Sequence, residues 1–330
     1  MKTFLGVDGG GTKTDFLLID ETGRELAATH AGSAYYPEIG VEVLKAMLAQ
    51  GIREVSAQAA LPLQELSFAC IGLPAYGEDS ALLDRLDQLI VGTVPISRYR
   101  CVNDMVCGWA AALGGRDGIN IVAGTGSIGY GEYEGRSTRA GGWGELFSDE
   151  GSAYWMAREG LTLFSRMSDG RAQRGPLYEL MRAHFGLRAD IDVCAKVYGP
   201  PAMLRSELAA LAPIVAQAVR AGDGQAMRLF ERAADELSGI VHALRERLAV
   251  PLGVPLAVSY SGGMFRLDSV LTWMLETSLR RSGRPYEFAA PRLSPRAGAA
   301  LYAAKLSGAP LGPDAVARLA AAHGAVVEAT

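Results

Sequence analysis

Asp8 and Asp104 are the two side chains whose type and position best suit catalysis in this chain. Asp8 follows the apolar run 3–7 and Asp104 follows the run 99–102, so each is predicted at the end of a buried strand. A carboxylate placed there can accept a proton from a hydroxyl group or hold Mg²⁺, because hard cations prefer carboxylate oxygen. Asp104 could also cap a helix predicted over 104–114, since aspartate is a favoured N-cap residue.

A glycine-rich turn directly after Asp8 is a candidate anion site. Its residues are Gly9, Gly10, Gly11, Thr12 and Lys13. The run nearly matches a Walker A loop, but Thr12 separates Gly11 from Lys13, and a strand rather than a helix is predicted next, over 15–19. Backbone N–H groups in such a turn can still bind phosphate, and Thr12 and Lys13 can donate to it. The alternative is a glycine-rich hairpin that binds nothing.

Two more glycine turns follow strands later in the chain. The second consists of Gly124, Thr125, Gly126 and Ser127 and matches GxGxxG over 124–129. A dinucleotide fingerprint should open a helix, whereas 128–133 is predicted as a strand, so a second phosphate turn is favoured over a Rossmann site. The third turn contains Gly262, Gly263 and Met264, where small residues let a flat ring lie against the backbone. A tight strand-to-helix connection is the alternative for this third turn.

The elements that must position these turns repeat along the chain. The first part is predicted as three strands, then helix, strand, helix, strand, and a second part that begins near 117 again opens strand, glycine turn, strand. The predicted strands are 3–7, 15–19, 24–30, 67–72, 99–102, 119–122, 128–133 and 255–260. The predicted helices are 38–60, 78–92, 104–114, 152–168, 176–186, 203–221, 224–249, one ending near 282, and 294–307. Two related α/β halves are expected, each offering a glycine turn to a ligand.

Composition excludes several classes of protein. With 330 residues the chain exceeds one ordinary hydrophobic core, so two domains are expected. A net charge of -4 argues against nucleic acid or an anionic membrane as partner. No apolar run is long enough to span a membrane, and no signal peptide is apparent. The cysteines (Cys70, Cys101, Cys107 and Cys194) lack metal-site spacing and are expected to be free, buried thiols in a cytoplasmic protein.

Five motifs together resemble the N-acetylglucosamine kinase group of the BadF/BadG/BcrA/BcrD ATPase family, within the superfamily of sugar kinases, heat-shock chaperones and actin. They lie at 6–14, 103–104, 123–129, 141–155 and 261–266. The resemblance implies an α/β fold of two ribonuclease H-like (actin-like ATPase) domains around a central cleft. It implies an N-terminal domain of residues 1–116 plus about 292–330, and a C-terminal domain of residues 117–291 with a helical insertion. A homodimer is expected from the resemblance only.

The resemblance also implies roles for individual residues in a kinase that uses ATP and Mg²⁺. Asp104 corresponds to the general base, and Asp8 to the residue that holds Mg²⁺ through water. The two phosphate turns are 9–13 and 124–127, and Gly262, Gly263 and Met264 flank the adenosine. The implied sugar-binding residues are Tyr35, Tyr76, Asp104, Gly142 and Asp149. The implied reaction forms N-acetylglucosamine 6-phosphate, with glucosamine, glucose or an N-acetylmuramic acid-type sugar as other acceptors.

Departures from the family pattern leave the sugar open. Tyr35 stands where relatives carry Asn, Tyr76 lies in a segment that is small and polar in some relatives, and Ala140 replaces a Cys of the animal enzyme. The tail 309–330 has no assigned role.

Two other functions compete with a kinase. One is a BadF-type ATPase that activates a redox partner. Such activators share an iron–sulfur cluster across a dimer, and Cys101 and Cys107 are not in a loop suited to ligate one. The other is a sugar sensor without catalysis, which would need neither Asp8 nor Asp104.

Overall fold

The computed structural model describes residues 1–267 and 269–325. The chain forms two compact units, Met1–Asn120 with Ala289–Thr330 (unit 1) and Ile121–Phe288 (unit 2). Unit 1 is therefore built from both ends of the chain, and unit 2 is one continuous segment.

A five-stranded mixed sheet forms the centre of unit 1, in the order β3-β2-β1-β4-β5. Strands β1, β2 and β3 are antiparallel neighbours, and β1, β4 and β5 run parallel. The central strands β1 and β4 contain runs of apolar residues and are buried on both faces, as expected for parallel neighbours. The bounds are β1 (Thr3–Gly9), β2 (Thr14–Asp20), β3 (Glu25–Ala31), β4 (Phe68–Leu73) and β5 (Tyr99–Asn103).

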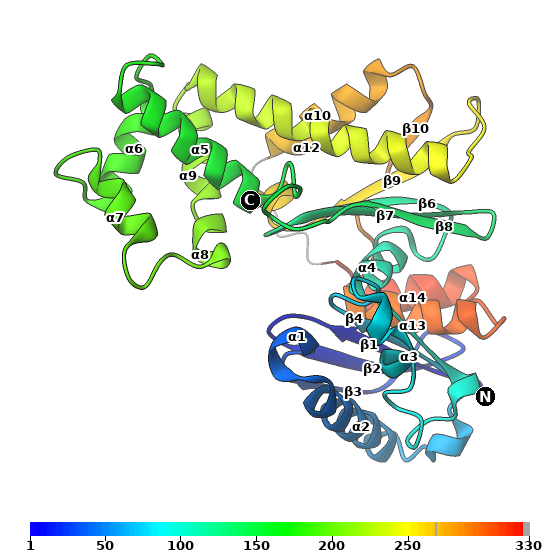
Figure 1. The fold of residues 1–330 in the computed structure, drawn as a ribbon. Coiled ribbons are helices and arrows are strands. Elements are labelled where there is room, and N and C mark those ends of the chain that lie inside the picture. Colours follow the sequence, from blue (N-terminus) through cyan, green and yellow to red (C-terminus); the bar gives the residue numbers. More distant parts are fainter. Residues whose placement is uncertain (268, 326–330) are drawn as a thin grey trace. The chain divides into compact units, whose positions relative to one another are not determined.

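Helices cover both faces of this sheet (Figure 1). On one face, α2 (Val41–Gln58) packs Leu44, Leu48 and Ile52 into a core with Phe16 of β2. On the other face lie α4 (Asp104–Leu113) and α13 (Pro295–Leu306), with α14 (Pro313–His323) beside α13. The shorter elements of unit 1 are α1 (Tyr36–Ile39), α3 (Leu83–Asp87), η1 (Leu63–Glu65), η2 (Ser80–Leu82) and η3 (Ile96–Arg98).

The alanine-rich helix α13 approaches its neighbours closely enough to require glycine at two places. A Cβ on Gly6 of β1 would overlap the backbone of Ala300, and a Cβ on Gly298 of α13 would overlap the backbone of Ala111 and Cys107 in α4. These contacts bury the middle of α13 against both β1 and α4. Backbone approach, rather than turn formation, therefore explains both glycines.

Unit 2 repeats the sheet of unit 1. Its strand order is β10-β9-β6-β7-β8, which is the order of unit 1 when β6 to β10 replace β1 to β5. The β7–β8 pair is antiparallel and the β9–β10 pair is parallel, as in the corresponding pairs of unit 1. The strands are β6 (Gly118–Ala123), β7 (Ser127–Tyr133), β8 (Arg136–Gly141), β9 (Leu256–Ser261) and β10 (Tyr286–Phe288). The predicted α/β fold with two actin-like ATPase domains is confirmed.

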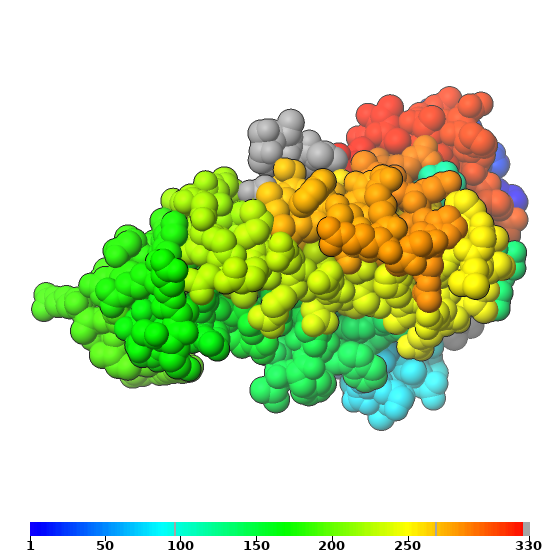
Figure 2. All heavy atoms as spheres, turned by 90° about the horizontal axis from the view of Figure 1, so that it is seen from above, coloured from blue at the N-terminus to red at the C-terminus, as the bar shows by residue number. Residues whose placement is uncertain are grey.

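Helices of unit 2 fall into two groups. The long α10 (Gly224–Arg247) packs on β7 and β8 and against α12 (Ser269–Arg281). The other helices before α10 gather at one end of unit 2, coloured green in Figures 1 and 2. They are α5 (Ala153–Ser168), α6 (Pro176–Phe185), α7 (Asp192–Tyr198), α8 (Arg205–Ala209) and α9 (Ala212–Arg220). The short helix α11 (Met264–Leu267) follows β9 and does not belong to this group.

Three predictions of local structure were wrong. The helix predicted over 78–92 is only η2 and α3, and the carbonyl of Asp87 that would continue it accepts a hydrogen bond from the Tyr99 hydroxyl instead. The helix predicted over 203–221 is broken into α8 and α9, because Pro213 has no N–H to extend α8. Cys194 is exposed rather than buried, because the short helix α7, which was not predicted, buries Val197 and leaves Cys194 at the surface.

The tail from residue 309 contains α14, whose C-terminal end is tied to the segment just before α13 by hydrogen bonds from Ser294 N to His323 O and from Ala325 N to Arg292 O. Residues 268 and 326–330 lie outside the described residues. Residue 268 falls within the helix predicted to end near 282, and residues 326–330 fall within the tail. Along the described part of the chain, no helix combines the length and the apolar character needed to cross a membrane.

Candidate active site

Asp8 and Asp104 lie at the same edge of the unit 1 sheet. Asp8 is near the end of β1 and pairs in register with Gly72 of β4, while Asp104 directly follows β5. The carboxyl ends of the parallel strands β1, β4 and β5 meet at this edge, which is where α/β sheets usually bind ligands. A Cβ on Gly72 would lie 3.5 Å from the Cα of Asp104 and would overlap Cys107 Sγ. A small residue between the two aspartates therefore keeps them close.

Asn103, not Asp104, caps helix α4. The Asn103 side chain accepts a hydrogen bond from Met105 N at 3.1 Å and donates one to Tyr76 O at 3.0 Å. Asp104 is the first helical residue, so its side chain is not used as the cap. The capping alternative for Asp104 was therefore wrong, although the backbone N–H groups of Met105 and Asp104 do act on its carboxylate and lower its pKa.

Both aspartates have a raised pKa. Burial, followed by the charges of Asp104 and Asp15, raises the pKa of Asp8 to about 7. Burial, with a smaller contribution from Glu78, raises the pKa of Asp104 to about 6. Clustered carboxylates with raised pKa values are typical of catalytic and cation-binding sites. A pKa of about 6 leaves most of the Asp104 carboxylate ionised at neutral pH.

Replacing Asp8 by Asn is expected to stabilise the ligand-free protein at pH 8. A raised pKa in the folded state means that the stabilising contribution is complete below pH 4 and is lost as pH rises towards 7. Asn imitates the protonated form, so it removes that loss, which is at most about 4 kcal/mol. Thermal melts without Mg²⁺ should show a clearly larger gain for Asp8→Asn at pH 8 than at pH 4.5.

Asp20→Asn serves as the contrasting variant. Burial opposes ionisation of Asp20, but hydrogen bonds from Thr22 and Arg24 outweigh it and lower the pKa of Asp20. This variant should therefore lose stability at pH 8. A loss of stability for Asp8→Asn at pH 8 would contradict the assigned environment of Asp8.

The first glycine turn is exposed at Gly11, Thr12 and Lys13. Gly10 N donates to Lys13 O at 2.9 Å and closes the turn, and Gly9 approaches the backbone of Gly72 too closely for any other residue. A Cβ on Gly11 would meet nothing within 4 Å, and its φ is not in the left-handed region, so the fold itself does not require glycine there. The Lys13 ammonium lies 2.9 Å from Asp15 and is 65% exposed. This combination of open backbone and an accessible cation fits an anion.

The second glycine turn lies against the start of helix α5. Ala153 N and Tyr154 N donate to Gly124 O and Thr125 O at 2.8 and 3.3 Å, and the Ser127 hydroxyl donates to Glu150 O. Gly124 resembles Gly11 in having nothing within 4 Å of a Cβ position. Corresponding turns of the two repeated sheets thus each contain one glycine that local packing does not explain.

Asp149 lies beside the second turn. It is 3% exposed, has a left-handed φ of 63°, and accepts a hydrogen bond from Ser127 N at 3.4 Å. Its other carboxylate oxygen is 2.5 Å from Nη2 of Arg205. Burial raises the pKa of Asp149 in spite of these partners.

The third glycine turn joins β9 to α11. Gly262 has a φ of 103° and packs on the backbone of Ala123, so both its conformation and its contact require glycine. Gly263 has open space around its Cβ position, and Met264 is buried. The open space at Gly263 leaves room for a ring, although a tight connection explains Gly262 by itself.

The predicted sugar-binding tyrosines differ in availability. Tyr35 is half-buried, and its hydroxyl finds no acceptor within the described part of the chain. The Tyr76 hydroxyl donates to Asp87 at 2.6 Å and its ring packs against the core of unit 1. Tyr76 can therefore offer a sugar its ring but not a free hydroxyl. Gly142 has a φ of 70° and packs on Ile128, so the fold alone requires a glycine at that position.

Cys101 and Cys107 are both buried in unit 1. The Cys101 thiol donates to Leu86 O at 3.4 Å, and the Cys107 thiol lies 4.0 Å from Val7 O. Burial of the Cys101 thiol and of the Cys107 thiol removes the exposure that a cluster shared between two subunits would need.

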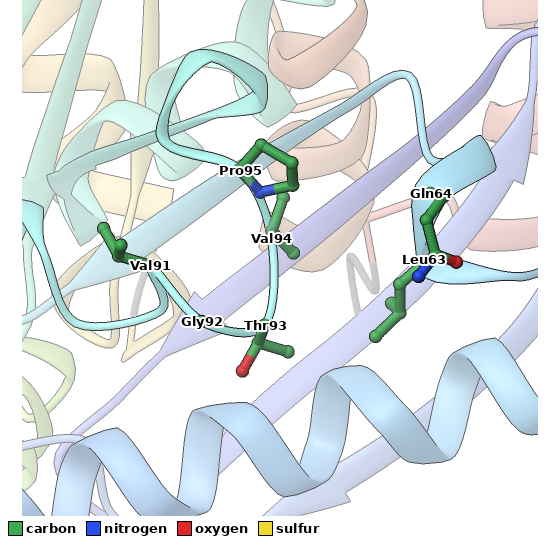
Figure 3. Close-up of a pocket in the computed structure, with 7 residues that line it drawn as sticks. All are labelled: Leu63, Gln64, Val91, Gly92, Thr93, Val94 and Pro95. Atoms are coloured by element: carbon green, nitrogen blue, oxygen red, sulfur yellow. The ribbon is translucent and has the colours of Figure 1, made fainter.

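A hollow on the surface of unit 1 lies apart from the two aspartates. This hollow of about 280 Å³, shown in Figure 3, is lined by Leu63, Gln64, Val91, Gly92, Thr93, Val94 and Pro95. These residues precede β4 and β5, so the hollow lies at the amino ends of the strands, opposite the edge that carries Asp8 and Asp104. None of the predicted site residues lines it.

Two residues of the site were missed by sequence reasoning. Asp15 belongs to none of the five motifs, yet it forms an ion pair with Lys13 and contributes to the raised pKa of Asp8. Its position opposite Asp8 in a β1–β2 hairpin could have been read from the alternation of the two strands. Arg205 had no signal at all, since it lies 56 residues from Asp149 and belongs to no motif.

Known proteins resemble the chain over most of its length. It is 25% identical to N-acetyl-D-glucosamine kinase of Dictyostelium discoideum over 91% of this chain and 97% of the relative. It is 30% identical to N-acetylmuramic acid/N-acetylglucosamine kinase of Clostridium acetobutylicum over 76% and 81% of the two chains. A solved structure of a candidate N-acetylglucosamine kinase from Chromobacterium violaceum is 26% identical, with a TM-score of 0.67 over 92% of this chain and 99% of that chain.

The family model that matches this chain covers residues 5–303, which include both units and all three glycine turns. The match therefore does not rest on one motif or on one of the two repeated sheets. The chain belongs to the BadF/BadG/BcrA/BcrD ATPase family.

Proposed function

We propose that this protein is an ATP-dependent sugar kinase that transfers the γ-phosphoryl group of ATP to a hydroxyl of an amino sugar, with N-acetylglucosamine as acceptor and its 6-phosphate as product. The observation that carries the proposal is the pair Asp8 and Asp104, which lie at one sheet edge beside an open glycine turn and have raised pKa values. The names of the relatives support a sugar kinase and favour an amino sugar.

Asp104 is assigned as the general base. A sugar hydroxyl has a high pKa, so its proton must be accepted as the new O–P bond forms. A carboxylate with a pKa of about 6 is ionised at neutral pH and is a stronger base than an exposed aspartate. In the proposal, Asp104 accepts the proton of the sugar hydroxyl, while Tyr35, Gly142 and Asp149 orient the sugar, and Tyr76 packs its ring beside it.

The glycine turns are assigned to the nucleotide. Residues Gly9, Gly10, Gly11, Thr12 and Lys13 and residues Gly124, Thr125, Gly126 and Ser127 would hold the phosphates, and Gly262, Gly263 and Met264 would flank the adenosine. Phosphoryl transfer depends mostly on positioning and on neutralising charge, which open amides and Lys13 can supply.

Mg²⁺ fits the residues around Asp8. Burial is the main cause of the raised pKa of Asp8, and the charges of Asp104 and Asp15 add to it, so both carboxylates lie near enough to Asp8 to act on it. No three acidic, His or Cys side chains converge as a complete metal site within the described residues. That suits Mg²⁺, which usually takes one or two carboxylates together with waters and substrate phosphates. When bound, the ion would neutralise phosphate charge, with Asp8 holding it through water.

A coupled assay of ADP release over a panel of sugars tests the proposal. N-acetylglucosamine should give the highest kcat/KM, above N-acetylmuramic acid, glucosamine and glucose, and 6-deoxy-N-acetylglucosamine should give no transfer. The product should show the phosphorus coupling of a 6-phosphate by NMR. ADP release that is independent of any sugar would instead indicate an ATPase and would contradict the proposed function.

A further inference from the structure

Arg205 lies over the second glycine turn although it comes from a distant segment of unit 2. It is the first residue of α8, and its Nη2 atom is 2.5 Å from Asp149 Oδ2. Its Nε atom is 3.3 Å from Glu145 Oε2. A Cβ added to Gly126 would be 2.8 Å from both Arg205 Nη2 and Asp149 Oδ2, so the guanidinium touches the turn itself.

The two glycine turns are alike in their charges as well as in their backbone. Lys13 at the first turn is paired with Asp15, and Arg205 at the second turn is paired with Asp149. In each pair the cation is the more exposed partner, with 65% of Lys13 and 41% of Arg205 accessible against 16% and 4% for the carboxylates. Each turn therefore presents an exposed cation that is paired with a less exposed carboxylate.

We propose that Arg205 binds a phosphate group of the nucleotide at the second glycine turn, and that Asp149 and Glu145 hold it there when no nucleotide is bound. This inference rests on the proposed use of ATP and adds a residue to that site. A guanidinium offers parallel N–H groups that match phosphate oxygens in pairs, which a single ammonium cannot do. Gly124 leaves room for the phosphate, and Gly126 leaves room for the guanidinium beside the turn.

Nucleotide binding would also affect Asp149. A phosphate that takes Arg205 from Asp149 frees Oδ2, while Ser127 N still holds Oδ1. The freed oxygen is an acceptor for a sugar hydroxyl, so nucleotide and sugar should strengthen each other's binding. By linkage the effect must be the same in both directions.

Binding of MgAMP-PNP to Arg205→Met, measured by isothermal titration calorimetry, tests the inference. The variant should bind at least 10-fold more weakly than the wild type, an effect expected for loss of one charged phosphate contact. Arg171→Met is the matched control, because Arg171 also pairs with an aspartate of unit 2, Asp169, on an exposed loop. It should bind MgAMP-PNP as the wild type does.

A second variant separates phosphate binding from folding. Arg205→Gln loses the charge but keeps an N–H group that can donate to Asp149, so it should fold if Arg205→Met does not. It too should bind MgAMP-PNP at least 5-fold more weakly. In addition, N-acetylglucosamine affinity should rise when MgAMP-PNP is present in the wild type and should not rise in Arg205→Gln.

Unchanged MgAMP-PNP affinity in the folded Arg205→Gln variant would overturn the inference. So would a loss of sugar affinity alone, because it would mean that Arg205 only positions Asp149. The titration needs no turnover, so it remains informative if the sugar panel fails. Arg205-dependent nucleotide binding together with an inactive wild type would refute the kinase proposal and not this one.

Discussion

Replacing Asp104 by Asn should lower kcat by about 10²–10⁴-fold while leaving the protein folded, the range expected for loss of a general base. Asn keeps the size of the side chain and cannot accept the proton. Helix α4 should be unaffected, because its cap is Asn103 and not Asp104. Turnover of N-acetylglucosamine with MgATP, together with circular dichroism, measures both quantities. Near-normal kcat in this variant would show that Asp104 is not the base.

The pH profile gives an independent check on Asp104. With a pKa of about 6 the carboxylate becomes protonated below that pH, so kcat/KM should fall on the acidic side near pH 6. Glu78 contributes to the raised pKa, so Glu78→Gln should move this fall to lower pH. Asp84→Asn, which removes an exposed carboxylate from α3, should leave the profile unchanged.

Replacing Gly298 by Ala should lower the free energy of unfolding of unit 1 by about 3 kcal/mol, near the upper end for an overpacked core. The new methyl group would overlap the Ala111 N and Cys107 O atoms of α4. These are backbone atoms inside a helix, so they cannot rotate away as a side chain could. Helix α13 would have to shift from both α4 and β1.

Urea unfolding followed by tryptophan fluorescence measures this effect through Trp109 in unit 1, and the tryptophans of unit 2 report on the control variant. Trp109 is buried in α4 beside Tyr302 of α13, and the other three tryptophans lie in unit 2. Gly239→Ala is the control, since Gly239 is also inside a helix but has open space around its Cβ position. That variant should gain about 0.5–1 kcal/mol through helix propensity. Equal effects of the two changes would show that close packing of α13 is unimportant.

The parts of the fold that follow from local pattern could be predicted from the sequence. Apolar runs that end in Asp8 and Asp104 marked β1 and β5, and the repeated strand, glycine turn, strand pattern indicated the duplicated sheet. Helix boundaries were less predictable where a distant partner decides them. The Tyr99 hydroxyl donates to the Asp87 carbonyl at the end of α3, and no residue close to Asp87 in the sequence indicates this hydrogen bond.

The candidate site residues also divide into those that a local pattern identifies and those that a distant contact brings in. The glycine turns are contiguous, so spacing alone identifies them, and Lys13 lies within the first. Arg205 comes from the helical group of unit 2 and meets Asp149 only in three dimensions. The Tyr76 hydroxyl is a comparable case, because its bond to Asp87 depends on how the short α3 packs and not on the residues around Tyr76.

The division of unit 1 between both ends of the chain has a consequence during synthesis on the ribosome. Strands β1 to β5 emerge first, but the face that α13 covers stays open until residues 295–306 have been made. Unit 2 is continuous, so it can fold while unit 1 still waits for its last helices. The close glycine contacts of α13 are thus among the last to form in the newborn chain. Ribosome-bound chains that stop before residue 295 should expose the apolar face of β1 and β4 to chaperones.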